Sequence, residues 1–128
     1  MARVRPRPTD AELAILRVLW ELGPATVRQV HEALADTRET GYTTTLKLMQ
    51  IMADKGLVTR DESSRTHIYA ATVTQEHTQR QLVKDLVDRA FGGSAKALLL
   101  RALSDDGTTA NELREIRKLI DDAREKQS

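Results

Sequence analysis

The segment from Tyr42 to Val58 limits the possible folds more than any other part of the sequence. Its residues form two opposite helix faces of different character, and a glycine marks the end of the helix. At about 100° per residue, one stripe is expected to face the core and carries Thr45, Leu48, Met49 and Met52. The opposite stripe carries Thr43, Lys47, Gln50 and Asp54. Gly56 supplies a left-handed cap, with Leu57 as its apolar contact. We expect a helix over 42–55 with one buried face and one outward-facing side.

Two shorter helices are predicted before this segment, and a hairpin after it. Pro8 and the box Thr9-x-x-Glu12 open the first helix, which Gly23-Pro24 ends. The box Thr26-x-x-Gln29 opens the second. Residues 58–60 and 66–71 have strand composition around the polar turn 61–65. This order predicts a winged helix-turn-helix over residues 9–73, in which the 42–55 helix recognises DNA.

Residues 74–128 consist mainly of helix formers, in three amphipathic segments separated by Gly92-Gly93 and Asp106-Gly107. A region this short cannot bury all of its apolar stripes by itself. We therefore expect a second copy of the chain to cover them. The predicted dimerisation residues are Leu82, Leu86, Ala90, Phe91, Leu98, Leu99, Leu103, Leu113, Ile116 and Ile120. The fold class is therefore mainly α with a small β-hairpin: a basic tail (1–8), the winged helix-turn-helix, and a C-terminal helical dimerisation arm (74–128).

The formal net charge is only +1, so the distribution of charge matters more than its sum. Lys47, Arg60 and Arg65 place positive charge around the proposed recognition helix and wing. Arg3, Arg5 and Arg7 form a tail that either follows a DNA groove or is a solvated end. The sequence has neither a signal-peptide core nor an apolar run of about 18 residues, so we expect a soluble cytoplasmic protein.

The outward face of the 42–55 helix carries side chains suited to the major groove. Glutamine pairs with adenine, threonine meets a thymine methyl or a phosphate, and lysine reaches guanine or the backbone. We therefore predict DNA contacts from Thr43, Thr44, Lys47 and Gln50, the alternative being an ordinary solvated face. Leu46 beside them either contacts a base or packs under Tyr42.

Contacts with the DNA backbone are predicted from the wing, which is the hairpin over residues 58–71, and from the second helix. Arg65 and His67 are placed to bind phosphates, or to form a solvated loop. Tyr69 either offers its hydroxyl to a phosphate or packs in the core. Thr26 and Arg28 begin the second helix, whose N-terminal dipole favours an anion, although Thr26 is also the cap.

No enzymatic or metal chemistry is predicted. The chain has no cysteine, which excludes a disulfide framework, a thiolate metal site and a cysteine nucleophile. His31, His67 and His77 are scattered without ligand spacing, and the pairs Asp105-Asp106 and Asp121-Asp122 fit solvated positions. We expect no cofactor, no metal and no small-molecule substrate.

Four stretches, in this order and spacing, resemble the penicillinase-repressor family of bacterial transcription regulators (BlaI/MecI/CopY type). They are TDAELAILRVLW, PATVRQVHEAL, GYTTTLKLMQIMADKGLV and RTHIYAATV. The likeness covers essentially the whole chain, because DRAFGGSAKALLLRAL and residues 112–120 look like the family's dimerisation arm. The resemblance implies a homodimer that binds a palindrome in double-stranded promoter DNA and represses transcription until an inducing signal removes it.

The family's known inducing chemistry does not transfer cleanly. In antibiotic-responsive members a membrane sensor protease triggers cleavage of the arm at an Asn-Phe bond, and alignment places Arg101-Ala102 there. Copper-responsive members carry a C-terminal cysteine motif, and this chain has no cysteine. A winged-helix adaptor that binds proteins and not DNA is the alternative function, favoured by the near-neutral charge.

Overall fold

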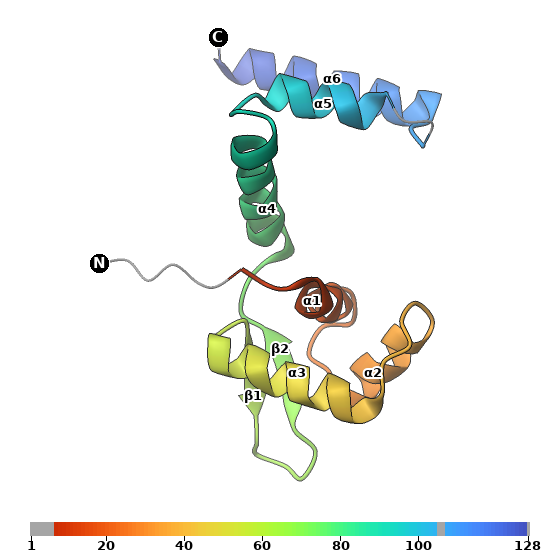
Figure 1. Ribbon diagram of the computed structural model, residues 1–128, viewed down its shortest axis with the longest axis vertical. Helices are drawn as coiled ribbons and strands as arrows, with labels where there is room; N and C mark the ends of the chain where they lie inside the picture. The colour runs from red at the N-terminus through yellow and green to blue at the C-terminus, as the bar shows by residue number, and fades with distance from the viewer. Residues whose placement is uncertain (1–6, 105–106, 128) are drawn as a thin grey trace, which may run out of the picture. The chain divides into compact units, whose positions relative to one another are not determined.

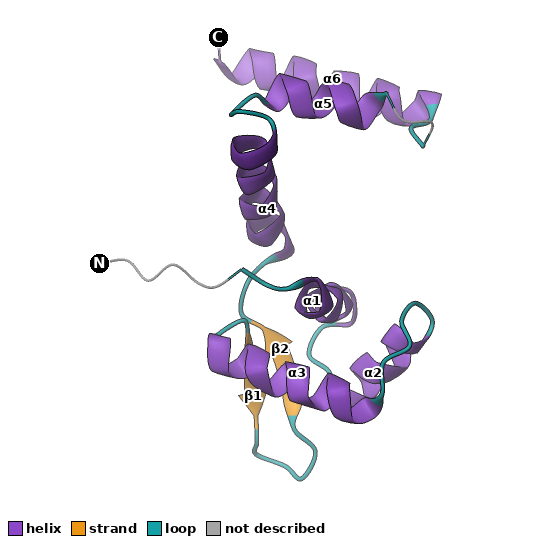
Figure 2. Ribbon diagram, in the orientation of Figure 1, coloured by secondary structure: helices purple, strands orange, loops and turns teal. Residues whose placement is uncertain are grey.

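The computed structural model describes residues 7–104 and 107–127, which form six helices and one antiparallel hairpin (Figures 1 and 2). The chain divides into two compact units, Met1–Gln81 and Leu82–Ser128. The elements, in order, are α1 (Asp10–Leu22), α2 (Val27–Ala35), α3 (Tyr42–Lys55), β1 (Val58–Asp61), β2 (Ile68–Ala71), α4 (Gln75–Ala90), α5 (Ala95–Leu103) and α6 (Ala110–Gln127). The predicted fold class, mainly helical with a small hairpin, is confirmed.

Local hydrogen bonds set the helix ends where the sequence predicts them. In α1 the Thr9 N–H donates to Glu12 Oε1 at 2.9 Å, and the Glu12 N–H donates to Thr9 Oγ1 at 3.2 Å. Thr26 and Gln29 form the same reciprocal pair in α2. Gly56 ends α3 with φ 82° and ψ 14°, and the Leu57 N–H returns to the Met52 carbonyl at 2.9 Å. A left-handed φ favours glycine because it has no Cβ.

The core of the first unit lies between α1, α2, α3 and the hairpin. Its buried apolar residues are Ile15, Leu16, Leu19, Ala25, Val27, Val30, Leu34, Met49, Met52, Leu57, Val58, Tyr69 and Val73. The Ala25 and Tyr69 backbones exchange hydrogen bonds of 2.9 and 2.8 Å, which attach the α1–α2 connection to β2. The hairpin pairs Val58 with Ala71 and Asp61 with Ile68. Its second strand starts at Ile68 rather than at the expected Thr66, because the Ser64 hydroxyl donates to the Thr66 carbonyl within the loop.

One partly buried ion pair links the start of α1 to the end of α3. Lys55 Nζ lies 3.0 and 2.9 Å from the two carboxylate oxygens of Glu12, which is 1% exposed. Burial opposes ionisation of Glu12, but the Lys55 ammonium and the Thr9 N–H outweigh it and hold the pKa of Glu12 below its ordinary value. The ion pair thus fixes the C-terminal end of the proposed recognition helix to α1.

The start of α4 belongs to the first unit, because Thr78 is buried and the Trp20 Nε1–H donates to the Val73 carbonyl at 2.9 Å. In the second unit, the Ser94 and Thr109 hydroxyls accept backbone N–H groups at the starts of α5 and α6. No side chain of α5 or α6 is buried. Among the predicted dimerisation residues, Leu86, Leu99, Leu113 and Ile120 are 40–49% exposed. None of the helices in the described residues is long and apolar enough to span a membrane.

Candidate nucleic-acid interface

A groove of about 520 Å³ lies between the start of α2, residues 42–50 of α3 and the hairpin. Six predicted DNA contacts line it: Thr26, Arg28, Gln50, Arg65, His67 and Tyr69. Tyr42, Leu46, Arg60, Val27 and Thr66 complete the lining. Three of these residues are arginines and none is a carboxylate, so the lining suits a polyanion.

The other three predicted contacts lie on α3 outside this lining. Thr43, Thr44 and Lys47 are exposed, and their spacing places them with Gln50 on one outward side of the helix. The α3 N-cap is Gly41, which offers no side-chain hydrogen bond, so backbone N–H groups of the first turn remain available to an anion. Helix α3 therefore offers a polar outer face and an open N-terminus.

Tyr69 does not sit as a surface contact. Its side chain is 1% exposed and belongs to the core, which matches the packing interpretation and not the phosphate contact. Leu46 is half-buried and likewise packs against the core. We therefore leave both out of the proposed DNA contacts.

Arg60 lines the groove. The sequence indicates its positive charge but does not predict it as a DNA contact. It pairs with Tyr69 across the hairpin, and its Nε lies 2.7 Å from Glu62 Oε1. The Tyr69 side chain and the Glu62 carboxylate raise the pKa of Arg60. Strand periodicity puts Arg60 on the same face as the buried Val58, so it gave no signal for an exposed groove residue, and the position of Arg60 beside the groove depends on the register with β2.

The loop of the wing carries negative as well as positive charge. The Ser63 N–H donates to Asp61 Oδ1 at 2.9 Å, and the bonds from Ser63 lower the pKa of Asp61. Arg65 and His67 are exposed in the same loop. Asp61 and Glu62 would repel a phosphate backbone, so the positive surface of the wing is local and not continuous.

Tyr42 was not predicted as a functional residue, yet it stands where α2 meets the start of α3. The Arg28 Cζ lies 5.7 Å from the centre of its ring, and the His31 ring meets it edge-on at 5.8 Å. The sequence signal for a role of Tyr42 is that an aromatic residue directly precedes Thr43-Thr44. Its partners Arg28 and His31 could not be predicted, because tertiary packing brings α2 to it.

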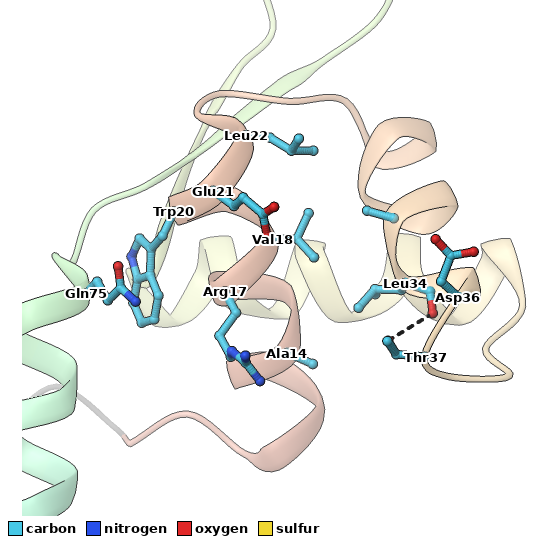
Figure 3. Close-up of a pocket in the computed structure, with 11 residues that line it drawn as sticks. Ala14, Arg17, Val18, Trp20, Glu21, Leu22, Leu34, Asp36, Thr37 and Gln75 are labelled. Carbon is cyan, nitrogen blue, oxygen red and sulfur yellow. Dashed lines mark hydrogen bonds between the residues drawn. The ribbon is translucent and has the colours of Figure 1, made fainter. Parts of the chain in front are cut away.

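A second hollow, of about 620 Å³, lies between α1 and α2 beside Gln75 (Figure 3). Arg17 on α1 is the basic residue of its lining, against the carboxylates of Glu21 and Asp36. The Thr37 hydroxyl in this hollow already donates to the Leu34 carbonyl at 3.3 Å. Its charge balance does not suit a nucleic acid, so the groove beside α3 is the candidate interface.

The remaining predicted positions are dispersed. Arg3, Arg5 and the pair Asp105-Asp106 lie outside the described residues, and Arg7 is exposed. Arg101 and Ala102 are exposed on α5. Within 7–104 and 107–127, no three histidine, aspartate or glutamate side chains converge as metal ligands.

Comparison with protein families gives a match to the family described as penicillinase repressor, over residues 8–122. The chain is 34% identical over 113 residues to the transcriptional regulator BlaI of Mycobacterium tuberculosis, covering 87% of this chain and 80% of that protein. It is 19% identical over 117 residues to the penicillinase repressor of Bacillus licheniformis, covering 91% of each.

Two solved structures share the fold of just under three fifths of the chain. One is the solution structure of monomeric Bacillus licheniformis BlaI in complex with the blaP half-operator, with a TM-score of 0.50 and 20% identity, covering 59% of this chain and 92% of that one. The other is the DNA-binding domain of the repressor BlaI, with a TM-score of 0.51 and 20% identity, covering 58% and 90%. At this identity the likeness concerns the fold.

Proposed function

The chain belongs to the penicillinase repressor family, and on that basis we propose that it represses transcription as a homodimer bound to a palindromic promoter operator. The observation that carries the proposal is the groove beside α3, which is lined by three arginines and no carboxylate. The polar outer face of α3 adjoins this groove. This combination suits a polyanion. A protein-binding adaptor would instead be expected to present an apolar patch.

We assign α3 to the major groove, which is wide enough for one helix. Gln50 and Lys47 then read base edges, while Thr43 and Thr44 contact a thymine methyl or a phosphate. Arg65 and His67 of the wing, with Arg28 of α2, meet the flanking backbone. Arg60 is added to this set because it lines the same groove.

A second copy of the chain is proposed to cover the arm. Helices α5 and α6 bury no side chain of their own, and large apolar residues of α4, α5 and α6 remain 40% or more exposed. Such an apolar surface is stabilised by burial against an identical partner, and two-fold symmetry matches a palindrome with half-sites one or more helical turns apart.

Release is proposed to act through the arm. Separating the arms lowers the effective concentration of the second recognition helix at its half-site, so affinity falls while the base contacts stay intact. Arg101-Ala102, which aligns with the family's cleavage position but does not keep its Asn-Phe motif, lies within α5, and a protease there would need this helix to unfold locally. A membrane sensor protease or direct displacement of the arm could supply that signal to a cytoplasmic repressor.

A fluorescence anisotropy titration tests the proposal, using duplexes from the region upstream of the protein's own gene and from neighbouring promoters. We expect binding whose log K falls with log salt by about 0.9 per phosphate neutralised. No binding to any duplex at low salt would favour the adaptor. Sedimentation of the full chain should give twice the monomer mass, and a monomer at micromolar concentration would contradict the role of the arm.

A further inference from the structure

The ring of Tyr42 is held between two side chains of α2. The Arg28 guanidinium lies 5.7 Å from the ring centre, within the range of about 6 Å for a cation–π contact. His31, three residues further along α2, meets the ring edge-on at 84°. His31 Nδ1 is buried without a hydrogen-bond partner among the described residues, so packing against Tyr42 orients that side chain. The ring therefore has a fixed place from which to support Arg28.

Arg28 is available to an external anion. No carboxylate lies within ion-pair distance of its guanidinium in the part of the chain that the structure describes. Arg28 stands in the first turn of α2, where the helix dipole also attracts negative charge. Both Arg28 and Tyr42 line the groove, and Tyr42 is 43% exposed. The cation and its aromatic support thus face the same space.

An arginine that rests on an aromatic face loses less side-chain freedom when it binds than a freely rotating one. Stacking on the ring also leaves the edge N–H groups of the guanidinium free to donate. A backbone phosphate accepts such a fork of two donors. The geometry therefore prepares Arg28 for a phosphate before DNA arrives.

We propose that Tyr42 is a positioning residue of the DNA interface, and that its ring holds the Arg28 guanidinium in the groove to meet a backbone phosphate. This inference rests on the proposed DNA-binding function and adds to it a residue that acts through Arg28. It separates the two roles: Arg28 carries the charge, and Tyr42 fixes its place.

The geometry is tested first without DNA, by the NMR chemical shift of the Arg28 Nε–H group. We expect a ring-current displacement in the full-length protein and in Tyr42→Phe, which keeps the ring. The displacement should disappear in Tyr42→Leu. An Arg28 resonance that is the same in Tyr42→Leu and in the parent protein would overturn the proposal, whatever the protein binds.

The consequence for binding is tested by anisotropy with a mixed-sequence duplex of about 30 base pairs, because phosphate contacts do not depend on sequence. Tyr42→Leu should weaken binding about 2- to 5-fold, the range expected of an exposed cation–π contact. Tyr42→Phe should bind like the parent. Arg28→Ala should make the salt slope shallower by about 0.9 for each phosphate that the guanidinium no longer neutralises. In the Arg28→Ala background, Tyr42→Leu should have no further effect.

Arg17→Ala is the matched control, because it removes one arginine from the hollow on the other side of α2 and should leave the salt slope unchanged. Urea unfolding of each variant checks that the fold is retained. An equal loss from Tyr42→Leu with and without Arg28 would overturn the proposal, and so would a Tyr42→Phe variant as weak as Tyr42→Leu. If the parent protein binds no duplex at low salt, the proposed function fails, and the NMR result still decides the geometry.

Discussion

Replacing Lys55 with methionine should destabilise the first unit more than replacing both members of the Glu12–Lys55 pair. In Lys55→Met the Glu12 carboxylate stays 1% exposed and loses the ammonium that contacts both its oxygens. Leaving one charge of a buried pair unpartnered costs about 3–5 kcal/mol. The Lys55 side chain is 30% exposed, so solvent reduces the loss, and we expect about 2–3 kcal/mol.

Glu12→Gln provides the matched variant, because the second capping box of the same chain already uses glutamine at this position, in Gln29. Glutamine keeps the acceptor for the Thr9 N–H and removes the charge. The double variant Glu12→Gln/Lys55→Met leaves no buried charge, so we expect it to be more stable than Lys55→Met alone by about 1–2 kcal/mol. A double variant more stable than Lys55→Met would show that the single variant is destabilised by an unpartnered charge and not by a loss of packing.

Urea unfolding followed by the fluorescence of Trp20, the chain's single tryptophan, measures these differences. Trp20 reports on the first unit because its indole N–H is bonded to the Val73 carbonyl. In thermal unfolding, 2–3 kcal/mol corresponds to about 8–24 °C for a domain of this size. A double variant no more stable than Lys55→Met would refute the argument.

The pH dependence follows from the lowered pKa of Glu12. A carboxyl whose pKa is lower in the folded protein than its ordinary value of 4.5 stabilises the fold above that value. That contribution is lost as pH falls through the lowered folded pKa. In Lys55→Met the carboxylate is buried without its partner, so the penalty should be largest near neutral pH and shrink on acidification, when protonation removes the charge. A penalty that stays constant from neutral pH to below 4.5 would contradict this explanation.

Three further results are expected. Gln50→Ala should cost about 1–3 kcal/mol of discrimination at one base pair and leave the salt slope unchanged, as measured by competition between operator variants; an unaltered sequence preference would remove Gln50 from the base contacts. Glu62→Gln should strengthen binding to mixed-sequence DNA about 2- to 5-fold, because it frees Arg60 and removes a repelling charge, and weaker binding in anisotropy would contradict that role. Truncation after Gln81 should give a folded monomer with reduced operator affinity, measured by sedimentation and anisotropy. Truncation after Ala71 should destabilise the first unit, because it removes the buried Val73 and Thr78. A dimeric 1–81 fragment would contradict the assignment of the arm.

The parts of the fold that were predictable from sequence depend on local interactions. Each capping box is closed within three residues, so Thr9 and Thr26 mark helix starts without any knowledge of tertiary structure. Gly56 marks a helix end for the same reason. The two-faced pattern of α3 is also confirmed, since Thr45, Met49 and Met52 are buried while Lys47 and Gln50 are exposed.

The parts that were not predictable depend on contacts between distant segments. Glu12 and Lys55 are 43 residues apart, and the sequence identified Glu12 as part of a capping box without indicating its ion pair with Lys55. Arg60 reaches the groove through the register of β1 with β2, and Arg28 reaches Tyr42 through the packing of α2 against α3. Periodicity shows which face of a helix is apolar, but it does not identify the neighbour that the face contacts.

The net charge of +1 is compatible with DNA binding because four of the positive residues lie at one surface. Arg28, Lys47, Arg60 and Arg65 lie in or beside the groove and α3. If all eight side chains of a dimer met phosphates, the salt slope would be about −7. Glu62 already pairs with Arg60 at 2.7 Å, and base contact by Lys47 would remove a phosphate partner, so four phosphate contacts remain in a dimer and a slope of about −3.6 is expected. A modest slope means weak sequence-independent binding, so affinity for the proposed operator would depend mainly on the proposed base contacts of α3 and on the pairing of two half-sites.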